Sequence, residues 1–236
     1  MLLDTETAMA RKTSKINVVP QAILEAASNL FIQRGYEGTT MQDIAKELDI
    51  SRSALYYYYK NKEEILVSLT EGLTLAAEQL ASQVVEKGKA PEEALREIVY
   101  QHAKLILYRP VQFRVVDQAL GSLPEKQRKI AETARRIVLQ RFTEVIQRGI
   151  DEGRFRLVNA RVTAFSLIGM CNWTAWWFKS AGAKSAEEIA EMLADLSLHA
   201  LERGEVKKVG KAGLDETLRI LEENLSQLKE VIDTQR

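Results

Sequence analysis

Residues 38–66 read GTTMQDIAKELDISRSALYYYYKNKEEIL, and this stretch decides the fold. Either Thr39 or Thr40 can accept backbone N–H groups as the N-cap of a helix that follows. The inward face of that helix is Met41, Ile44, Ala45 and Leu48. The letters LDIS then predict a tight turn, after which Ser51 can cap a third, shorter helix. Two short helices behind a longer support helix, which the periodicity places from Pro20 to Gly35, form a helix-turn-helix.

Four consecutive tyrosines lie in the third helix of this motif. Successive helical residues point about 100° apart, so Tyr59 shares the buried face of Leu55. Tyr56, Tyr57 and Tyr58 are then left on the outer side. Exposed phenols suit a phosphate backbone, because each offers an O–H donor and a flat apolar body that packs on sugar. The alternative is burial of all four rings against neighbouring helices, but the serines and bases beside them favour DNA.

The composition excludes several classes of protein. The chain has 236 residues, 46% of them apolar, and each of its four prolines stands at the head of a periodic apolar segment, which predicts an all-α fold. A single cysteine, Cys171, suits a reducing cytoplasm, and His102 and His199 lie far apart without metal-ligand spacing. No stretch reaches the roughly 18 apolar residues of a membrane span. We expect a cytoplasmic protein with no metal, no cofactor and no catalytic residues.

Charge is distributed unevenly along the chain. The formal net charge is zero, yet residues 11–62 carry more lysines and arginines than acids. A local basic face attracts phosphates whatever the total charge. The charge pattern is therefore compatible with nucleic-acid binding by the N-terminal part.

Beyond residue 66 the apolar spacing continues to be helical. It predicts helices over roughly 62–87, 91–108, 110–121, 124–151, 158–180 and 185–203. The expected organisation is a flexible basic arm over 1–16, a helix-turn-helix domain over 17–62, a helical ligand-binding and dimerisation domain over 63–205, and a heptad-patterned helix over 206–236.

The stretch GYEGTTMQDIAKELDISRSALYYYYKNKEEIL resembles the DNA-binding signature of the TetR/AcrR family, and the likeness covers about residues 17–66. The resemblance implies a dimer that reads two half-sites of double-stranded operator DNA. It also implies phosphate contacts from Thr40 and Lys62. The full set of expected DNA-binding residues is Thr39, Thr40, Ser51, Arg52, Ser53, Ala54, Tyr56, Tyr57, Tyr58 and Lys62. Two positions depart from the family pattern: Asp49 replaces a turn glycine, and Tyr59 replaces a phenylalanine.

All three tryptophans fall within FSLIGMCNWTAWWFKSAG, residues 165–182. One interpretation is a core or dimer interface, where aromatic residues are enriched. The other is an apolar ligand pocket with a few polar groups such as Asn172 and Thr174. The first is favoured for any single tryptophan, and both can hold for different faces. The residues expected at a pocket are Phe113, Arg141, Phe142, Arg148, Met170, Trp173, Trp176 and Trp177.

A second, weaker resemblance concerns the effector. The segment GMCNWTAWWF and the following SAEEIAEMLADL are similar to the C-terminal part of TetR-type regulators that respond to fatty acyl-CoA or related CoA thioesters. In those relatives a basic residue often stands where this chain has Trp176. Arg141 and Arg148, seven residues apart, are the cations most suited to the CoA phosphates.

The last segment shows a regular heptad pattern. Spacings of four and three separate the apolar residues Leu214, Leu218, Leu221, Leu225, Leu228 and Ile232. Such a seam needs a partner, because a solvated helix would leave it wet. The partner is the other subunit, the chain's own body or another protein.

Together these features predict a homodimeric repressor, not an enzyme, that a small apolar effector releases from its operator. The alternative is a repressor of an efflux system that senses drugs or other xenobiotics, since tryptophans suit cation–π contacts.

Overall fold

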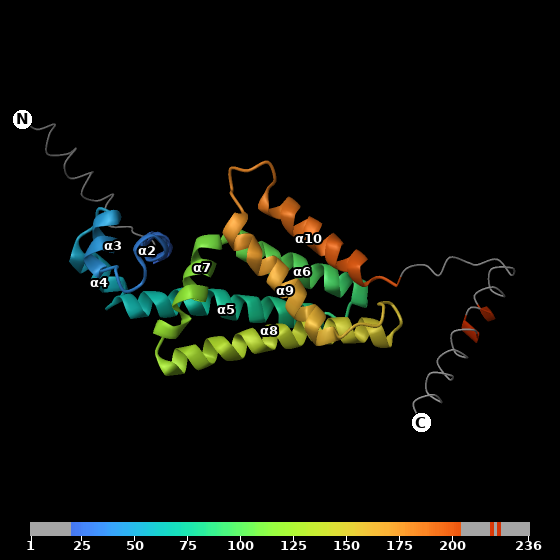
Figure 1. Cartoon of the computed structure of the whole chain (residues 1–236). Helices are drawn as coiled ribbons and strands as arrows, with labels where there is room; N and C mark the ends of the chain where they lie inside the picture. The colour runs from blue at the N-terminus through green and yellow to red at the C-terminus, as the bar shows by residue number, and fades with distance from the viewer. Residues whose placement is uncertain (1–19, 204–217, 220, 223–236) are drawn as a thin grey trace, which may run out of the picture. The chain divides into compact units, whose positions relative to one another are not determined.

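The computed structural model describes residues 20–203, 218–219 and 221–222, and these residues form helices with no strand among them (Figure 1). The helices are α2 (Pro20–Arg34), α3 (Met41–Glu47), α4 (Arg52–Tyr58), α5 (Lys62–Glu86), α6 (Pro91–Tyr108), α7 (Pro110–Ala119), η1 (Leu120–Ser122, a 3-10 turn), α8 (Glu125–Asp151), α9 (Ala160–Trp177) and α10 (Ala186–Leu201). The prediction of an all-α fold is confirmed. Pro91 and Pro110 occupy first helical turns, as expected from the missing N–H of proline.

A first hydrophobic core holds the helix-turn-helix together. It joins α2, α3 and α4 to the N-terminal half of α5 and to α7. Its buried residues include Ile23, Leu30, Phe31, Ile44, Leu55, Ile65, Leu66, Leu69, Leu73, Val115, Val116 and Ala119. About fifty residues separate α7 from the motif that it completes, so the helix-turn-helix depends on a distant segment for part of its core.

A second core unites the rest of α5 with α6, α8, α9 and α10. Figure 1 shows α5 running beside α8, with α10 against α6. α5 contributes Leu66 and Leu69 to the first core, then Ala81 and Val84 to the second. One continuous helix therefore crosses both cores, and no linker separates them.

The end of α8 is fixed by a close contact between Gly149 and Phe155. Phe155 is buried, and both Arg154 and Phe155 donate backbone N–H bonds of 2.9 Å to the Gly149 carbonyl. A Cβ placed on Gly149 would lie 2.1 Å from the Phe155 ring. Arg156 then ties this loop to α10 through a 2.9 Å backbone bond to Leu201. Glycine is required here by space, since only a hydrogen atom fits beneath the ring.

Two expected segments fall outside the described residues. These are the basic arm over 1–16 and most of the heptad segment over 206–236. Of the heptad residues, Leu218 and Leu221 are described; both are helical and about half exposed. Among the described residues, no helix combines the length and apolar character that a membrane span requires.

Replacing Gly149 with alanine should destabilise the chain by about 1–3 kcal/mol, because the added methyl group overpacks the Phe155 ring. Urea unfolding followed by circular dichroism measures the change. Gly72, on the exposed side of α5, is the matched control, since nothing lies within 4 Å of a Cβ built there. Gly72→Ala should stabilise the helix by about 0.5–1 kcal/mol. Equal effects of both substitutions would contradict the packing argument.

Cys171 should be unreactive in the folded protein. Its side chain is fully buried on α9, and burial raises the pKa of the thiol to about 12. At pH 8 a disulfide reagent such as DTNB should label Cys171 only after denaturant is added. Rapid labelling of the native chain would show that the thiol is accessible.

Candidate functional site

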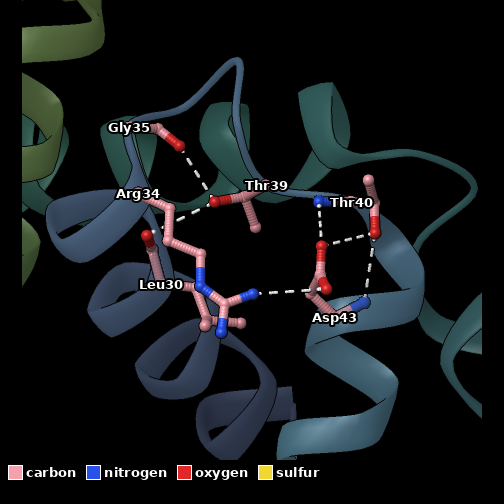
Figure 2. Close-up of polar contacts among 6 residues, drawn as sticks. All are labelled: Leu30, Arg34, Gly35, Thr39, Thr40 and Asp43. Carbon is pink, nitrogen blue, oxygen red and sulfur yellow. Dashed lines mark hydrogen bonds and ion pairs between the residues drawn. The ribbon is translucent and has the colours of Figure 1, made fainter.

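The N-terminus of α3 is fixed by a reciprocal pair of hydrogen bonds between Thr40 and Asp43 (Figure 2). The Thr40 hydroxyl accepts the Asp43 N–H at 3.2 Å, and the Asp43 carboxylate accepts both the Thr40 N–H at 2.9 Å and the Thr40 hydroxyl at 2.6 Å. The Thr40 hydroxyl and N–H lower the pKa of Asp43, and Arg34 at 3.3 Å adds to this effect. The capping box sets where the first helix of the motif begins.

Thr39, which was expected at the DNA-binding site, has a structural role in this chain. Its side chain is buried, and its hydroxyl donates to the Gly35 carbonyl at 2.9 Å (Figure 2). A second contact of 3.3 Å reaches the Leu30 carbonyl at the end of α2. Sequence spacing allowed either threonine as the N-cap; the structure assigns capping to Thr40 and loop anchoring to Thr39.

The start of α4 presents a prearranged polar group. Ser51 caps the helix by accepting the Ala54 N–H at 3.2 Å, and its hydroxyl lies 3.0 Å from that of Ser53. Arg52 hydrogen-bonds through its guanidinium to the Gln42 side chain on α3. Gln42 thereby links the two helices of the motif and positions the Arg52 side chain on the exposed surface.

The four tyrosines occupy three different environments. Tyr57 is 83% exposed and Tyr56 is 49% exposed, whereas Tyr58 is half-buried against the first core. Tyr58 and Tyr57 meet edge to face with centroids 5.1 Å apart. Tyr59 packs on the same core, and its hydroxyl lies 3.4 Å from that of Ser68. The exposed pair is thus Tyr56 and Tyr57, and the expectation that Tyr58 faces outward is correct only in part.

Lys62 is already engaged in the DNA-free chain. Its ammonium donates to the Tyr36 carbonyl at 2.9 Å, lies 4.5 Å from the Tyr36 ring centroid and pairs with Glu37 at 3.4 Å. A phosphate at this point would compete with Glu37 for the ammonium.

Asp49 adopts a positive φ of 51° in the turn, the left-handed region that glycine tolerates best.

A cavity of about 440 Å³ lies between α5, α6, α7, α8 and α9. This volume falls within the range typical of small-molecule sites. Its walls are mostly apolar and consist of Leu73, Thr74, Ala77, His102, Leu105, Ile106, Phe113, Val116, Asp117, Glu132, Arg135, Arg136, Val138, Leu139, Phe165, Ile168, Gly169 and Asn172. Two of them, Leu73 on α5 and Val116 on α7, also belong to the first core, so the cavity borders the core that supports the helix-turn-helix.

The charged residues of the cavity wall are accompanied by partners except for one arginine. Asp117 lies 3.8 Å from Arg135, and Glu132 lies 3.9 Å from Arg128 outside the wall. Arg136 is exposed and takes part in no ion pair of the described residues. Arg136 is therefore the cation of the wall that an anionic ligand can meet without displacing an ion pair of the described residues.

An uncharged pair of polar side chains also lines the cavity. The Nε2 atom of His102 lies 3.1 Å from the carboxamide oxygen of Asn172. His102 is buried and packs edge to face on Phe142 with centroids 5.6 Å apart. Burial lowers the pKa of His102, while the Asn172 hydrogen bond opposes that change. The imidazole is therefore neutral near pH 7, with its proton on Nε2, because the Asn172 oxygen can only accept.

Of the eight residues predicted to form a pocket, Phe113 lines this cavity. Arg141 instead contacts Ser82 and Glu144, and Arg148 donates to the Lys89 carbonyl at 2.6 Å. Phe142 and Met170 pack in the second core. Trp173, Trp176 and Trp177 lie outside the cavity wall as well, so seven of the eight expected residues are not part of the wall of this cavity.

Exposed apolar side chains are concentrated on α9 and α10. They are Val162, Phe165, Trp173, Trp176 and Trp177 on α9, with Met192 and Leu196 on α10. Trp173 and Trp176 stack with centroids 5.5 Å apart, and Trp176 meets Phe113 edge to face at 5.8 Å. Trp176 therefore connects this exposed face to a side chain of the cavity wall.

Sequence reasoning missed several residues of these two sites. Gln42 gave no signal beyond its place near the start of α3, and Arg135 and Arg136 were part of a helix face that reads as solvated. His102 appeared only as a histidine on an amphipathic helix. No group of three or more His, Cys, Asp or Glu side chains in the described part of the chain could hold a metal ion.

Comparison with known proteins agrees with this geometry. A family model described as "Bacterial regulatory proteins, tetR family" matches residues 23–69, and one described as "Tetracyclin repressor-like, C-terminal domain" matches residues 88–201. An uncharacterized HTH-type transcriptional regulator of Bacillus subtilis, YfiR, is 31% identical over 151 residues, which are 60% of this chain and 70% of that protein.

Two solved structures are also similar. PfmR of Thermus thermophilus, a TetR family transcriptional regulator, is 32% identical with a TM-score of 0.68, over 77% of this chain and 99% of that one. AibR, solved in complex with isovaleryl coenzyme A and operator DNA, is 30% identical with a TM-score of 0.61, over 75% of this chain and 96% of that one. The resemblance drawn from the N-terminal motif is confirmed, and the chain belongs to the TetR family of bacterial transcriptional regulators.

Proposed function

We propose that this chain is a repressor that binds a palindromic operator as a homodimer and is released when a small, largely apolar effector enters the cavity. The observation that carries the proposal is the double role of α7. Val115, Val116 and Ala119 are buried in the first core, and Phe113, Val116 and Asp117 line the cavity, so Val116 takes part in both. A ligand that displaces α7 therefore acts on the packing beneath the recognition helix.

At the operator, α4 is the element that enters the major groove. Arg52 has the bidentate donor geometry that selects guanine, and Gln42 holds it in place before DNA arrives. Ser53 and Ala54 approach base edges in this docking, and Tyr56 and Tyr57 supply phosphate and sugar contacts. Half-sites one helical turn apart require recognition helices about 34–36 Å apart, so a small change in their spacing prevents simultaneous docking.

The proposed effector is a CoA thioester with a short or medium acyl chain. The similarity to AibR, whose structure contains isovaleryl coenzyme A, supports this class. So does the cavity, which is large enough for an acyl chain and carries the exposed Arg136 in its wall. Arg136 takes the phosphate-binding role that the sequence had suggested for Arg141 and Arg148.

An efflux regulator that senses cationic drugs has less support. Such a site requires an acid held away from water beside aromatic rings. The acids of the cavity wall, Asp117 and Glu132, are about half exposed and have arginines nearby. The described residues include no buried aspartate or glutamate.

Dimerisation is proposed through the exposed apolar side chains of α9 and α10. Trp173 is 63% exposed, and Met192 and Leu196 are each 58% exposed, in a chain whose other large apolar residues are mostly buried. Apolar faces of this kind are typical of subunit contacts. A second copy covering the same helices would satisfy them by two-fold symmetry.

Fluorescence anisotropy on a labelled DNA fragment from upstream of the chain's own gene tests the function. The fragment is titrated with the protein, and the complex is then titrated with isovaleryl-CoA, octanoyl-CoA, free octanoate and a cationic dye. Release by the thioesters alone supports the proposed effector, and release by the dye alone supports the efflux alternative. Failure to bind either this fragment or a genomic pool would contradict the proposal of a DNA-binding repressor.

Tyr57→Phe should weaken operator binding by about 1 kcal/mol for each hydrogen bond to phosphate that the variant cannot form, without lowering the unfolding temperature. Tyr59→Phe is the matched control, because the Tyr59 ring packs on the first core and its hydroxyl lies 3.4 Å from that of Ser68 on α5. Anisotropy titrations of both variants measure the effect. An unchanged affinity of the Tyr57 variant, or an equal loss in both, would argue against the phosphate role.

Trp173→Glu should convert the dimer to monomers, because it places a charge in the proposed subunit contact. Ile130→Glu, on α8 and 38% exposed, introduces the same charge away from α9 and α10 and should leave the dimer intact. Sedimentation velocity at micromolar protein distinguishes the two species. A dimer that persists in the Trp173 variant would place the subunit interface elsewhere.

A further inference from the structure

The His102–Asn172 pair has hydrogen-bonding capacity that the protein does not use. The bond between them occupies Nε2 of His102 and Oδ1 of Asn172. Each side chain has a second polar atom, Nδ1 of His102 and Nδ2 of Asn172, and no hydrogen bond of the described residues engages either. Neither atom is a fully buried polar atom without a hydrogen-bond partner. Both residues line the cavity, and we infer that these two atoms are the ones a ligand in it would meet.

The spare atom of Asn172 is a donor. Because Oδ1 accepts from the imidazole, the amide group Nδ2 retains its two N–H bonds. The edge-to-face contact with Phe142 orients the imidazole of His102. The hydrogen bond from this imidazole in turn orients the carboxamide of Asn172. An amide N–H in a mostly apolar wall can donate to an oxygen acceptor of a ligand, and such a position gives selectivity when the competing ligand lacks the acceptor.

The acceptor should be uncharged. A carboxylate at Asn172 would be removed from water without a cation, and burial of an uncompensated charge is strongly unfavourable. The neutral imidazole of His102 does not provide that cation. The arginines of the cavity wall are the partly exposed Arg135, which lies near Asp117, and the exposed Arg136. An uncharged carbonyl of a ligand thus suits Asn172, and an anionic group suits the exposed Arg136.

We propose that His102 and Asn172 form a neutral polar site that selects effectors with a carbonyl oxygen inside an apolar body, while Arg136 binds the anionic end outside it. Asn172 donates to the carbonyl, and His102 positions Asn172. The shared chemistry is a thioester or ketone carbonyl linked to an anion, which is either the phosphate of a CoA ester or the carboxylate of a keto acid. This inference refines the effector named in the proposed function and rests on the same cavity.

Two pairs of probes isolate the carbonyl. Octanoyl-CoA and S-octyl-CoA differ in that the thioether lacks the carbonyl oxygen, and 4-oxodecanoate and decanoate differ in the internal ketone. Isothermal titration calorimetry with the full chain should give about tenfold tighter binding for the carbonyl-bearing member of a pair, the value of one uncharged hydrogen bond. This comparison needs no variant, so it remains informative if a substitution impairs folding.

Asn172→Leu removes the donor at similar volume. In this variant the two members of each probe pair should bind with about equal affinity. Thr74→Val is the matched control on the same wall, because the Thr74 hydroxyl already donates to the Thr70 carbonyl at 2.8 Å. That variant should keep the tenfold preference. A carbonyl preference that survives in the Asn172 variant, equal binding within both pairs, or no binding of any of the four probes would overturn the inference.

The binding results distinguish failure of the neutral site from failure of the proposed repressor function. If 4-oxodecanoate is preferred through Asn172 while octanoyl-CoA does not bind, the neutral site stands and the CoA effector is wrong. Affinity for the upstream DNA fragment is measured on the same samples without ligand. Loss of DNA binding with an intact carbonyl preference would count against the repressor and not against the neutral site.

Discussion

The double role of α7, in the first core and in the cavity wall, is the constraint on which the rest of the structure depends. The helix completes the core of the helix-turn-helix through Val115 and Ala119, and it lines the cavity through Phe113 and Val116. Packed interiors are dense and transmit displacement instead of absorbing it. This shared packing supports the proposal that a ligand in the cavity acts on the core beneath the recognition helix. Couplings between sites of about 1–3 kcal/mol are typical, and a shared helix is a sufficient physical route for one.

The exposed end of the motif is organised before any DNA is present. The capping box of Thr40 and Asp43, the Ser51 cap and the Arg52–Gln42 hydrogen bond each fix a polar group relative to a helix terminus. Ordering long side chains at an interface costs free energy on association, and pre-ordering reduces that cost. Lys62 is the exception, because its contacts with Tyr36 and Glu37 must be exchanged or shared when a phosphate approaches.

The helices could be predicted from the sequence because short-range sequence patterns determine where each of them begins and ends. Helical spacing, proline at first turns and serine or threonine at caps predicted each described helix within a few residues. The cavity could not be recovered in this way, since it is formed by five helices whose packing depends on contacts between distant residues. Arg141 and Arg135 belong to the same charged helix, and only the tertiary structure places Arg135 in the cavity wall while Arg141 contacts Ser82. Similarly, Thr39 and Thr40 are adjacent and chemically alike, but one is buried and the other is exposed.

The aromatic chain from Phe113 through Trp176 to Trp173 has an optical consequence. All three tryptophans of the protein lie within five residues of one helix end, so tryptophan emission arises from a single small region. That region touches the cavity wall through Phe113 and carries the exposed face of α9. A change in emission intensity therefore combines two events, occupation of the cavity and coverage of the α9 face. Varying the protein concentration and the ligand concentration separately distinguishes these two contributions to the emission.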